Sequence, residues 1–281
     1  MIPLKTINSD NCNILVVGCG KMGTAIVQGW LKNGVDGKSI HIVDPNESLL
    51  IGLHQDYGVK LYQSPDSLPK LMFDFVMVAL KPQQIERFLP TYDAWMNQST
   101  SLISIAAGIT TQSLHKIMPK LSNIIRIMPN TPALIQKGVL VAYAEPNVEQ
   151  AIKTYCQGLF SSLGHFYWIE NEAQMDAVTA ISGSGPAYLF YFMECFIAAA
   201  KDSGLPSELA KELAIHTVLG ASYLVESEDS NPTQLRIDVT SPKGTTQAAL
   251  NVLMHDDALQ RLMCDAIQAA KSRSQELAKL I

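Results

Sequence analysis

The stretch that decides the fold is Val17-Gly18-Cys19-Gly20-Lys21-Met22-Gly23, a glycine-punctuated turn between an apolar run and an amphipathic segment. The apolar run, residues 12–17, is rich in β-branched side chains, which predicts a short buried strand of a parallel sheet. Apolar residues with helical spacing follow between Met22 and Trp30, and Gly34 stands where a glycine commonly ends a helix. The sequence therefore predicts a strand, a tight turn and a helix in direct succession.

The glycines of this turn match the G-x-G-x-x-G pattern of dinucleotide-binding folds. Gly18 permits the tight turn, Gly20 lets the backbone approach a pyrophosphate, and Gly23 lets the helix pack closely on the strand. The start of the helix presents free N–H groups to the phosphates. We interpret the stretch as a nucleotide-binding loop, and the alternative is a plain strand-to-helix turn.

The composition limits the classes of protein to consider. The chain has 281 residues and is 47% hydrophobic, which is enough for a substantial core and two domains. The net charge is −5 and no block of Lys and Arg occurs, so we expect no nucleic-acid partner. The longest apolar stretch, residues 186–200, contains Glu194 and is too short to cross a bilayer, so we expect no membrane partner.

Cysteine and histidine positions favour a cytoplasmic protein without a metal. The five cysteines are scattered and include no C-x-x-C pair, which is typical of reduced thiols. The N-terminal residues show no charged segment followed by an apolar one, so no export signal is expected. The six histidines have no metal-ligand spacing.

Asp44 is a candidate for reading the cofactor ribose. It follows a predicted strand, residues 39–43, about 20 residues beyond the glycine turn, where dinucleotide-binding folds place an acidic residue. A carboxylate there accepts hydrogen bonds from ribose hydroxyls and repels a 2′-phosphate, which favours NADH over NADPH. The alternative is a turn aspartate, because Asn46 is a good N-cap for a helix over residues 47–57.

Two further strand ends carry candidate cofactor contacts. Lys81 follows a predicted strand, residues 73–80, and precedes a predicted helix, residues 83–95. Open α/β sheets bind ligands at the carboxyl ends of their strands, although a solvated loop lysine is the alternative. Ala106-Ala107-Gly108 follows the predicted strand 101–105 and leaves room for a flat ring or a phosphate.

The alternation of strands and helices predicts an α/β fold with a Rossmann-like, doubly wound, mostly parallel sheet whose strand-end loops share one edge. Further strands are expected at 59–61, 123–127, 138–144 and 164–169. Only helices are expected afterwards, at 171–180, 186–202, 206–226, 233–237, 245–255 and 257–279. We therefore predict a dinucleotide-binding domain, residues 1–169, and an all-helical substrate-binding and dimerisation domain, residues 170–281.

The predicted helix 186–202 is apolar on almost every side. A helix without a polar face needs neighbours all around it, which a small helical domain has difficulty providing. We therefore predict a homodimer with interleaved helices, to which the last helix contributes. The alternative is a central helix in a monomeric bundle.

Two loops of the helical region are dense in small polar residues. Residues 238–246, Asp-Val-Thr-Ser-Pro-Lys-Gly-Thr-Thr, stand before one helix, and residues 181–186, Ile-Ser-Gly-Ser-Gly-Pro, stand before another. Unpaired N–H groups and hydroxyls at such helix starts suit a substrate carboxylate. Ordinary helix caps are the alternative, because Ser and Thr commonly cap helices.

Taken together, the motifs resemble those of the Δ1-pyrroline-5-carboxylate reductases. The matching segments run in the family's order over nearly the whole chain: residues 18–23, 79–83 (Ala-Leu-Lys-Pro-Gln), 106–108, 126–133 (Arg-Ile-Met-Pro-Asn-Thr-Pro-Ala), 181–188 and 238–246. The resemblance implies reduction of the cyclic imine L-1-pyrroline-5-carboxylate to L-proline by NADPH or NADH. It also implies dimers through the helical domain, in some members assembled into decamers.

The resemblance also implies roles for single residues. It assigns pyrophosphate binding to the glycine turn, namely Gly18, Cys19, Gly20, Lys21, Met22 and Gly23. It places beside the ribose and nicotinamide the residues Ala79, Leu80, Lys81, Pro82, Ile105, Ala106 and Ala107. It brings to the substrate Glu172, Asp238, Ser241, Thr245 and Thr246, of which Thr246 is the expected catalytic contact.

Two positions depart from the family pattern. Lys243 stands where relatives have the first of two glycines, so this position must be right-handed helical or extended, or accept strain. Its ammonium either strengthens carboxylate binding or points to water. Asp44-Pro45 replaces a pair that accepts the 2′-phosphate in many relatives, which leaves the preference between NADH and NADPH open.

Two other functions compete with this one. A related imine or 3-hydroxyacid dehydrogenase would share the fold but act on another substrate, and a 3-hydroxyacid enzyme would carry a positioned Lys or His in its helical domain. A cofactor-binding regulatory protein would keep the fold without turnover. Intact polar loops at residues 182–186 and 241–246 argue against the regulatory protein.

Overall fold

The computed structural model describes residues 12–46, 48, 50–228 and 231–279. It divides into two compact units, residues 1–184 with 270–281, and residues 185–269. The chain therefore returns to the first unit for its last turns. The sequence assigns cofactor binding to residues 1–169 and substrate binding and dimerisation to residues 170–281. This division of the chain stays a prediction.

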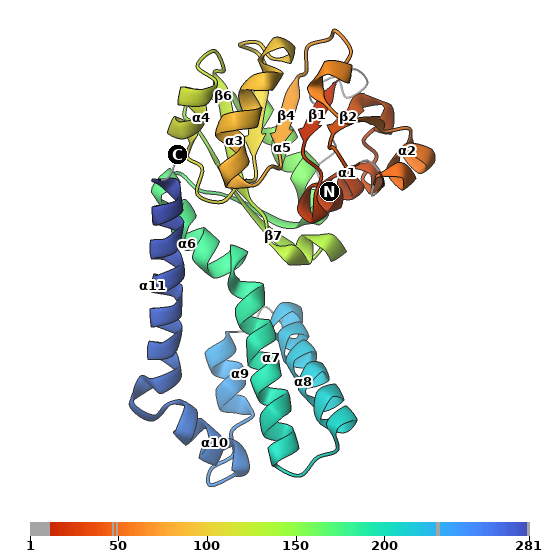
Figure 1. Ribbon diagram of the computed structural model, residues 1–281. Coiled ribbons are helices and arrows are strands. Elements are labelled where there is room, and N and C mark those ends of the chain that lie inside the picture. Colours follow the sequence, from red (N-terminus) through yellow and green to blue (C-terminus); the bar gives the residue numbers. More distant parts are fainter. Residues whose placement is uncertain (1–11, 47, 49, 229–230, 280–281) are drawn as a thin grey trace. The chain divides into compact units, whose positions relative to one another are not determined.

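The first unit is built on one eight-stranded sheet with the strand order β3-β2-β1-β4-β5-β6-β7-β8 (Figure 1). The strands are β1 (Ile14–Val17), β2 (Ile40–Val43), β3 (Lys60–Tyr62), β4 (Phe75–Val78), β5 (Ser101–Ser104), β6 (Asn123–Met128), β7 (Gly138–Ala144) and β8 (Gly164–Trp168). The first six strands are parallel and follow the Rossmann order, so the predicted fold class is confirmed.

Helices cover both faces of the sheet. The helices of this unit are α1 (Lys21–Lys32), α2 (Ile51–Tyr57), α3 (Pro82–Phe88), α4 (Thr111–Ile117), α5 (Gln150–Phe160) and α6 (Met175–Val178). Side chains of β1 alternate between two cores: Ile14 and Val16 pack with α1, α2 and α5, whereas Leu15 and Val17 pack with α3 and α4. The sheet is therefore buried on both sides, as a parallel sheet requires.

The glycine turn and α1 form as the sequence predicts. Gly34 has φ +91°, and its N–H donates to the carbonyl of Leu31, while the N–H of Val35 donates to the carbonyl of Trp30. This pair of bonds is a Schellman motif, which ends a helix at a left-handed residue that glycine adopts without strain.

The prediction that every strand-end loop lies at one edge of the sheet is wrong for β7 and β8. β7 pairs antiparallel with β6, and β8 is parallel to β7, so both run against the other six strands. The link between β6 and β7, residues 129–137, contains only the short 3₁₀ segment Thr131–Ile135. A parallel crossover needs a dozen or more residues, so this link can only reverse the chain.

Three predicted helices differ in the structure. Residues 83–95 are α-helical to Phe88 and 3₁₀-helical from Leu89 to Trp95, because Pro90 has no N–H and clashes within a continuing α-helix. Helix α2 begins at Ile51, and residues 47 and 49 lie outside the described chain. Asn46 is not its N-cap, because Leu50 holds that position, and the N–H of Asn46 instead closes a turn on the Asp44 carboxylate. Residues 171–180 begin with a 3₁₀ turn, Glu172–Gln174.

The expected loop at residues 181–186 is instead helical. A π-helical turn, Thr179–Gly183, joins α6 to α7, and the N–H of Ser184 donates to the carbonyl of Thr179 at 2.9 Å. Pro186 lacks the N–H that a regular helix needs, and an inserted π turn is a common way to relieve such a break.

The second unit is helical, as predicted. It contains α7 (Gly185–Asp202), α8 (Ser207–Glu228), α9 (Pro232–Asp238), α10 (Thr245–Leu253) and the first part of α11 (Ala258–Ala278). Several large apolar side chains of α7 are exposed, including Leu189, Phe190, Tyr191 and Phe192. In the described part of the chain no helix is long and apolar enough to cross a membrane.

His41 of β2 makes stability depend on pH. Its ring is completely buried, its Nδ1 lies 3.1 Å from the Tyr62 hydroxyl, and its Nε2 lies 3.3 Å from Lys60 Nζ. Because Lys60 can only donate, Nε2 must accept and the ring must be neutral. Burial and then the Lys60 charge lower the pKa of His41 from 6.5 to about 4.

We expect the free energy of unfolding to fall as the pH drops from about 6.5 towards 4. In this window the unfolded chain binds a proton at His41 and the folded protein does not, so protonation favours unfolding. One pKa unit corresponds to about 1.4 kcal/mol, which gives a loss of about 3 kcal/mol from this site. Urea unfolding at several pH values measures it. His41→Gln should flatten the slope in this window, and an equal slope in both proteins would contradict the assignment.

Candidate active site

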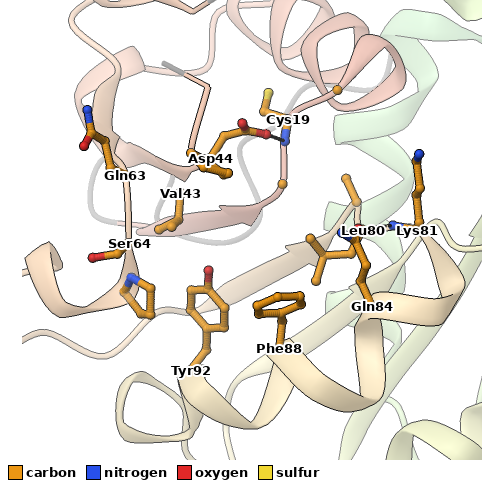
Figure 2. A pocket seen from close by; sticks show the side chains of 15 residues that line it. Cys19, Val43, Asp44, Gln63, Ser64, Leu80, Lys81, Gln84, Phe88 and Tyr92 are labelled. Atoms are coloured by element: carbon orange, nitrogen blue, oxygen red, sulfur yellow. Dashed lines mark hydrogen bonds between the residues drawn. The ribbon is translucent and has the colours of Figure 1, made fainter.

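A cavity of about 480 Å³ lies beyond the carboxyl ends of the first four strands. Its wall comes from the turn after β1, the end of β2, the segment after β3, the segment after β4, and one face of α3 with the 3₁₀ segment that follows. The lining residues are Gly18, Cys19, Gly20, Val43, Asp44, Pro45, Gln63, Ser64, Pro65, Ala79, Leu80, Lys81, Gln84, Phe88 and Tyr92 (Figure 2). Open α/β sheets bind ligands at this edge.

The three glycines have the geometry that the glycine pattern requires. Gly18 has φ +79°, and a Cβ there would lie 2.9 Å from Leu80 Cδ2 and 3.2 Å from the Ala79 carbonyl oxygen. A Cβ on Gly23 would lie 3.2 Å from the Gly18 carbonyl oxygen, which shows how closely α1 packs on the turn. A Cβ on Gly20 would meet no atom within 4 Å. The open side of the turn is therefore at Gly20, facing the start of α1.

The start of α1 fits a pyrophosphate. Gly20 is the N-cap and supplies no side chain to accept from the first N–H groups of the helix. Free helix N–H groups bind phosphate well. Lys21 is exposed and Met22 half-buried at the same helix start. The residues present therefore fit a dinucleotide.

Cys19 keeps this turn neutral. Its thiol is buried and lies 3.6 Å from the Thr24 hydroxyl, which in turn donates to the Cys19 carbonyl at 3.0 Å. Burial raises the pKa of Cys19 to about 12, with a smaller upward contribution from Asp44. The side chain remains a protonated thiol at neutral pH and adds no negative charge beside the phosphates.

Asp44 is held in place by two backbone groups. The N–H of Cys19 donates to Asp44 Oδ2 at 2.7 Å (Figure 2). The N–H of Asn46 donates to Asp44 Oδ1 at 2.8 Å. The carboxylate thereby ties the end of β2 to the glycine turn. Each oxygen keeps a lone pair for a further donor such as a ribose hydroxyl.

Several lining residues were not found from the sequence. Gln84, Phe88 and Tyr92 are four residues apart and lie on one helical face, so their spacing was a usable signal. The rings of Phe88 and Tyr92 lie near each other on one side of the cavity (Figure 2). Burial and the nearby Asp44 charge raise the pKa of Tyr92 to about 12, so its hydroxyl stays protonated. Gln63, Ser64 and Pro65 follow β3, a position that the strand-end rule also indicates.

Lys81 and Pro82 stand as predicted at the end of β4. Lys81 is the N-cap of α3, Pro82 is its first residue, and the N–H of Lys81 donates to Gln84 Oε1 at 3.3 Å. Lys81 supplies a cation to the cavity edge. Ile105 and Ala106, with Ala107 after them, follow β5, the neighbour of β4, and do not line this cavity.

Glu172 lies in the first unit and its carboxylate is occupied. It accepts from the N–H of Thr111, from the Thr111 hydroxyl and from Arg126 Nη1, at 2.6–2.8 Å. Arg126 is 4% exposed. The structure thus gives Glu172 internal partners on α4 and β6.

The other expected substrate residues lie in the second unit, around the start of α10. Gly244 is the N-cap of α10 and provides no side-chain cap, so the first N–H groups have no side-chain acceptor. Thr246 is half-buried, and in the described chain its hydroxyl makes no hydrogen bond. Thr245 and Ser241 are exposed beside it, and Asp238, at the end of α9, accepts from Gln234 at 2.7 Å.

Lys243 takes the strained alternative that the sequence left open. Its φ is +61°, in the left-handed region that costs an L-residue about 1–2 kcal/mol. The N–H of Lys243 donates to Gln247 Oε1 at 2.6 Å, which holds the turn, and the side chain is exposed.

The described residues contain no group of three His, Cys, Asp or Glu side chains that could hold a metal ion. A glycine turn open at a helix start, an acidic residue beside it and a large cavity at the sheet edge define a nicotinamide-dinucleotide-dependent oxidoreductase of the Rossmann class.

Comparison with known proteins gives the family. Residues 172–277 match the family model of pyrroline-5-carboxylate reductase dimerisation, and residues 13–108 match that of coenzyme F420-dependent NADP oxidoreductase. The chain belongs to the pyrroline-5-carboxylate reductase family. The pyrroline-5-carboxylate reductase of Haemophilus influenzae is 36% identical over 95% of this chain and 98% of its own.

Two solved structures agree over the whole fold. The pyrroline-5-carboxylate reductase of Coxiella burnetii is 34% identical with a TM-score of 0.87, over 95% of this chain and 99% of its own. The pyrroline carboxylate reductase of Plasmodium falciparum, solved with NADP bound, is 28% identical with a TM-score of 0.82. The match covers 95% of this chain and 98% of the other. The family model of the helical region also shows that this region serves oligomerisation.

Proposed function

We propose that this protein reduces L-1-pyrroline-5-carboxylate to L-proline with a hydride from NADPH or NADH, the final step of proline biosynthesis. The observation that carries the proposal is the likeness, over 95% of the chain, to relatives that bear this enzyme's name. The cavity at the glycine turn supports it, because its open helix start and its lining suit the adenosine and pyrophosphate part of a dinucleotide.

The cavity supports assignments for the pyrophosphate, ribose and adenine, and the family resemblance supports one for the nicotinamide. The pyrophosphate lies at Gly20 and the start of α1, and the ribose hydroxyls donate to Asp44. The adenine packs among Val43, Leu80 and Phe88, which are apolar and lie around the cavity (Figure 2). Residues 105–107, after β5, flank the nicotinamide, which supplies the hydride when bound.

The substrate chemistry needs few protein groups. The imine carbon accepts a hydride readily once its nitrogen is protonated, and a cyclic imine is basic enough to arrive protonated or to take a proton from water. The protein then has to orient the ring, which alone can lower a barrier by about 7–11 kcal/mol in favourable cases. The start of α10, with Ser241, Thr245 and Thr246, binds the carboxylate, and Asp238 lies near it in sequence. The protonated ring nitrogen donates to the Thr246 hydroxyl.

One assay separates the candidate functions. Oxidation of NADH and of NADPH is followed with pyrroline-5-carboxylate, and reduction of NAD and NADP is followed with 3-hydroxyacids. Turnover of pyrroline-5-carboxylate supports the proposal, and turnover of 3-hydroxyacids alone would replace it. Cofactor binding without either turnover would indicate a regulatory protein. Retained activity after dialysis against a chelator is expected, because the proposed chemistry uses no metal.

Asp44→Asn is expected to raise the ratio of kcat/KM with NADPH to kcat/KM with NADH by about 10–100-fold, or about 1.4–2.8 kcal/mol. The carboxylate repels a 2′-phosphate, and two backbone N–H groups prevent it from turning away. The wild type should use both cofactors. Asp36→Asn is the matched control, since Asp36 also caps a backbone N–H but lines no part of the cavity. A wild-type KM for NADPH far below that for NADH would contradict this role of Asp44.

The oligomer is a homodimer formed through the helical unit, with decamers as a further assembly. The exposed apolar side chains of α7 and the dimerisation family model support the dimer. A stable monomer in sedimentation at micromolar concentration would contradict it. We place the enzyme in the cytoplasm, in keeping with five free cysteines.

A further inference from the structure

The loop between β5 and α4, residues 105–110, is contacted at Gly108 and at its α4 end by residues far away in the sequence. It is short, residues 106–108 are Ala-Ala-Gly, and Gly108 has φ +77°. Ala106 and Ile109 anchor the loop in the core, while the backbone between them has no large side chain and is positioned by its neighbours. Under the proposed function this loop flanks the nicotinamide, so its position sets where the hydride donor lies.

Glu172 fastens the end of the loop where α4 begins. Its Oε1 accepts from the N–H of Thr111 at 2.8 Å, and its Oε2 accepts from the Thr111 hydroxyl at 2.7 Å. Arg126 of β6 donates to Oε1 at 2.6 Å, and the side chains of Arg126 and Glu172 are 5% and 20% exposed. A charge-assisted pair with so little solvent contact holds its geometry better than an exposed one.

The last turns of α11, which belong to the same compact unit, close the other side of the loop. A Cβ on Gly108 would lie 3.2 Å from Leu277 Cβ, so these two segments are in contact. The buried Ser274 donates to Asp176 Oδ1 at 2.7 Å, which ties α11 to the segment that carries Glu172. The loop is thus enclosed by residues 172–176 on one side and 274–278 on the other.

We infer that Glu172 is a positioning residue for hydride transfer, which acts through Thr111 on the loop of residues 105–110. This inference rests on the proposed function and replaces a direct substrate contact of Glu172. Three hydrogen bonds from within the chain already fix this carboxylate, two on Oε1 and one on Oε2, so its position is set by α4 and β6. The negative charge of Glu172 is matched by Arg126, so the pair adds no net charge to the site.

The experiment compares Glu172→Gln and Thr111→Val with the wild type in the pyrroline-5-carboxylate assay. Glu172→Gln should lower kcat by about 10–100-fold and change the KM for pyrroline-5-carboxylate by less than about 3-fold, because a small misplacement of the donor slows hydride transfer. The dissociation constant of NADH should also change by less than about 3-fold, since the cavity proposed for its adenosine and pyrophosphate part is separate from this loop. The primary isotope effect with NADH deuterated at the transferred C4 position should rise.

Thr111→Val removes the hydroxyl donor and should show the same pattern to a smaller extent. Because the two residues act as one unit, the double variant should lose no more than Glu172→Gln alone, within about 2-fold. Glu145→Gln is the matched control. It breaks an ion pair of equal length, 2.6 Å to His115 at the other end of α4, without touching the loop. It should keep kcat and the isotope effect.

The outcomes separate the inference from the proposed function. A wild type that does not oxidise NADH or NADPH with pyrroline-5-carboxylate overturns the proposed function itself. An active wild type with an unchanged kcat in Glu172→Gln overturns the inference, and so does a rise in KM alone or an additive double variant. If Glu172→Gln does not fold, judged by circular dichroism, Thr111→Val decides by its kcat and isotope effect.

Discussion

Gly20→Val is expected to raise the dissociation constants of NADH and NADPH by at least about 100-fold while the melting temperature stays within a few degrees of the wild type. A Cβ at Gly20 meets no atom within 4 Å, and φ −66° suits any residue, so the fold tolerates a side chain there. Under the proposed function the pyrophosphate approaches the backbone in this open space. Losing two hydrogen bonds to a charged phosphate, at about 1.5–3 kcal/mol each, gives an effect of this size.

Titration of cofactor fluorescence measures the binding, and thermal unfolding measures the fold. Gly52→Val is the matched control, because a Cβ at Gly52 also meets nothing within 4 Å and Gly52 lines no part of the cavity. Its dissociation constants should equal those of the wild type. Tight binding by Gly20→Val would mean that the turn is an ordinary strand-to-helix turn and that the cofactor lies elsewhere.

The sequence was sufficient where local chemistry decides the structure. The turn after β1 needs glycine at φ +79°, and the end of α1 needs it at φ +91°, so the residue type states the conformation. The strands that are buried on both faces could also be predicted from the sequence, because they consist of β-branched and other apolar residues. These features account for the confirmed fold class and for the position of the glycine turn.

Other features depend on contacts that no local pattern records. The return of residues 270–281 to the first unit rests on single contacts such as that of Ser274 with Asp176, and the sequence around Ser274 reads as an ordinary helix. The three donors around Glu172 come from α4 and β6, which only the folded sheet brings together. By contrast, the reversed β7 was predictable, since the link of residues 129–137 is too short for a crossover.

The start of α10 shows why a candidate residue can be found from sequence and yet its role cannot. The motif identified Thr246, and the structure adds that its hydroxyl has no partner in the described chain, whereas the nearby Thr240 hydroxyl donates to the Arg236 carbonyl at 2.5 Å. Thr240 is therefore satisfied by α9, and Thr246 is available to a ligand. A helix start that is capped by a glycine leaves its N–H groups available as well.

Thr246→Ala is therefore expected to lower kcat/KM for pyrroline-5-carboxylate by about 10–1000-fold, the effect of losing one oriented hydrogen bond to a charged or polar reacting centre. Under the proposed function the protonated ring nitrogen donates to this hydroxyl, and its loss should leave the imine carbon less well aligned for the hydride. Thr246→Ser keeps the hydroxyl and should restore most of the activity. Thr233→Ala, which removes an exposed hydroxyl on α9, should match the wild type. Steady-state kinetics with saturating NADH measures kcat/KM for the three variants. Equal kcat/KM values for Thr246→Ala and the wild type would refute the catalytic role, because the Thr246 hydroxyl would then take no part in the reaction.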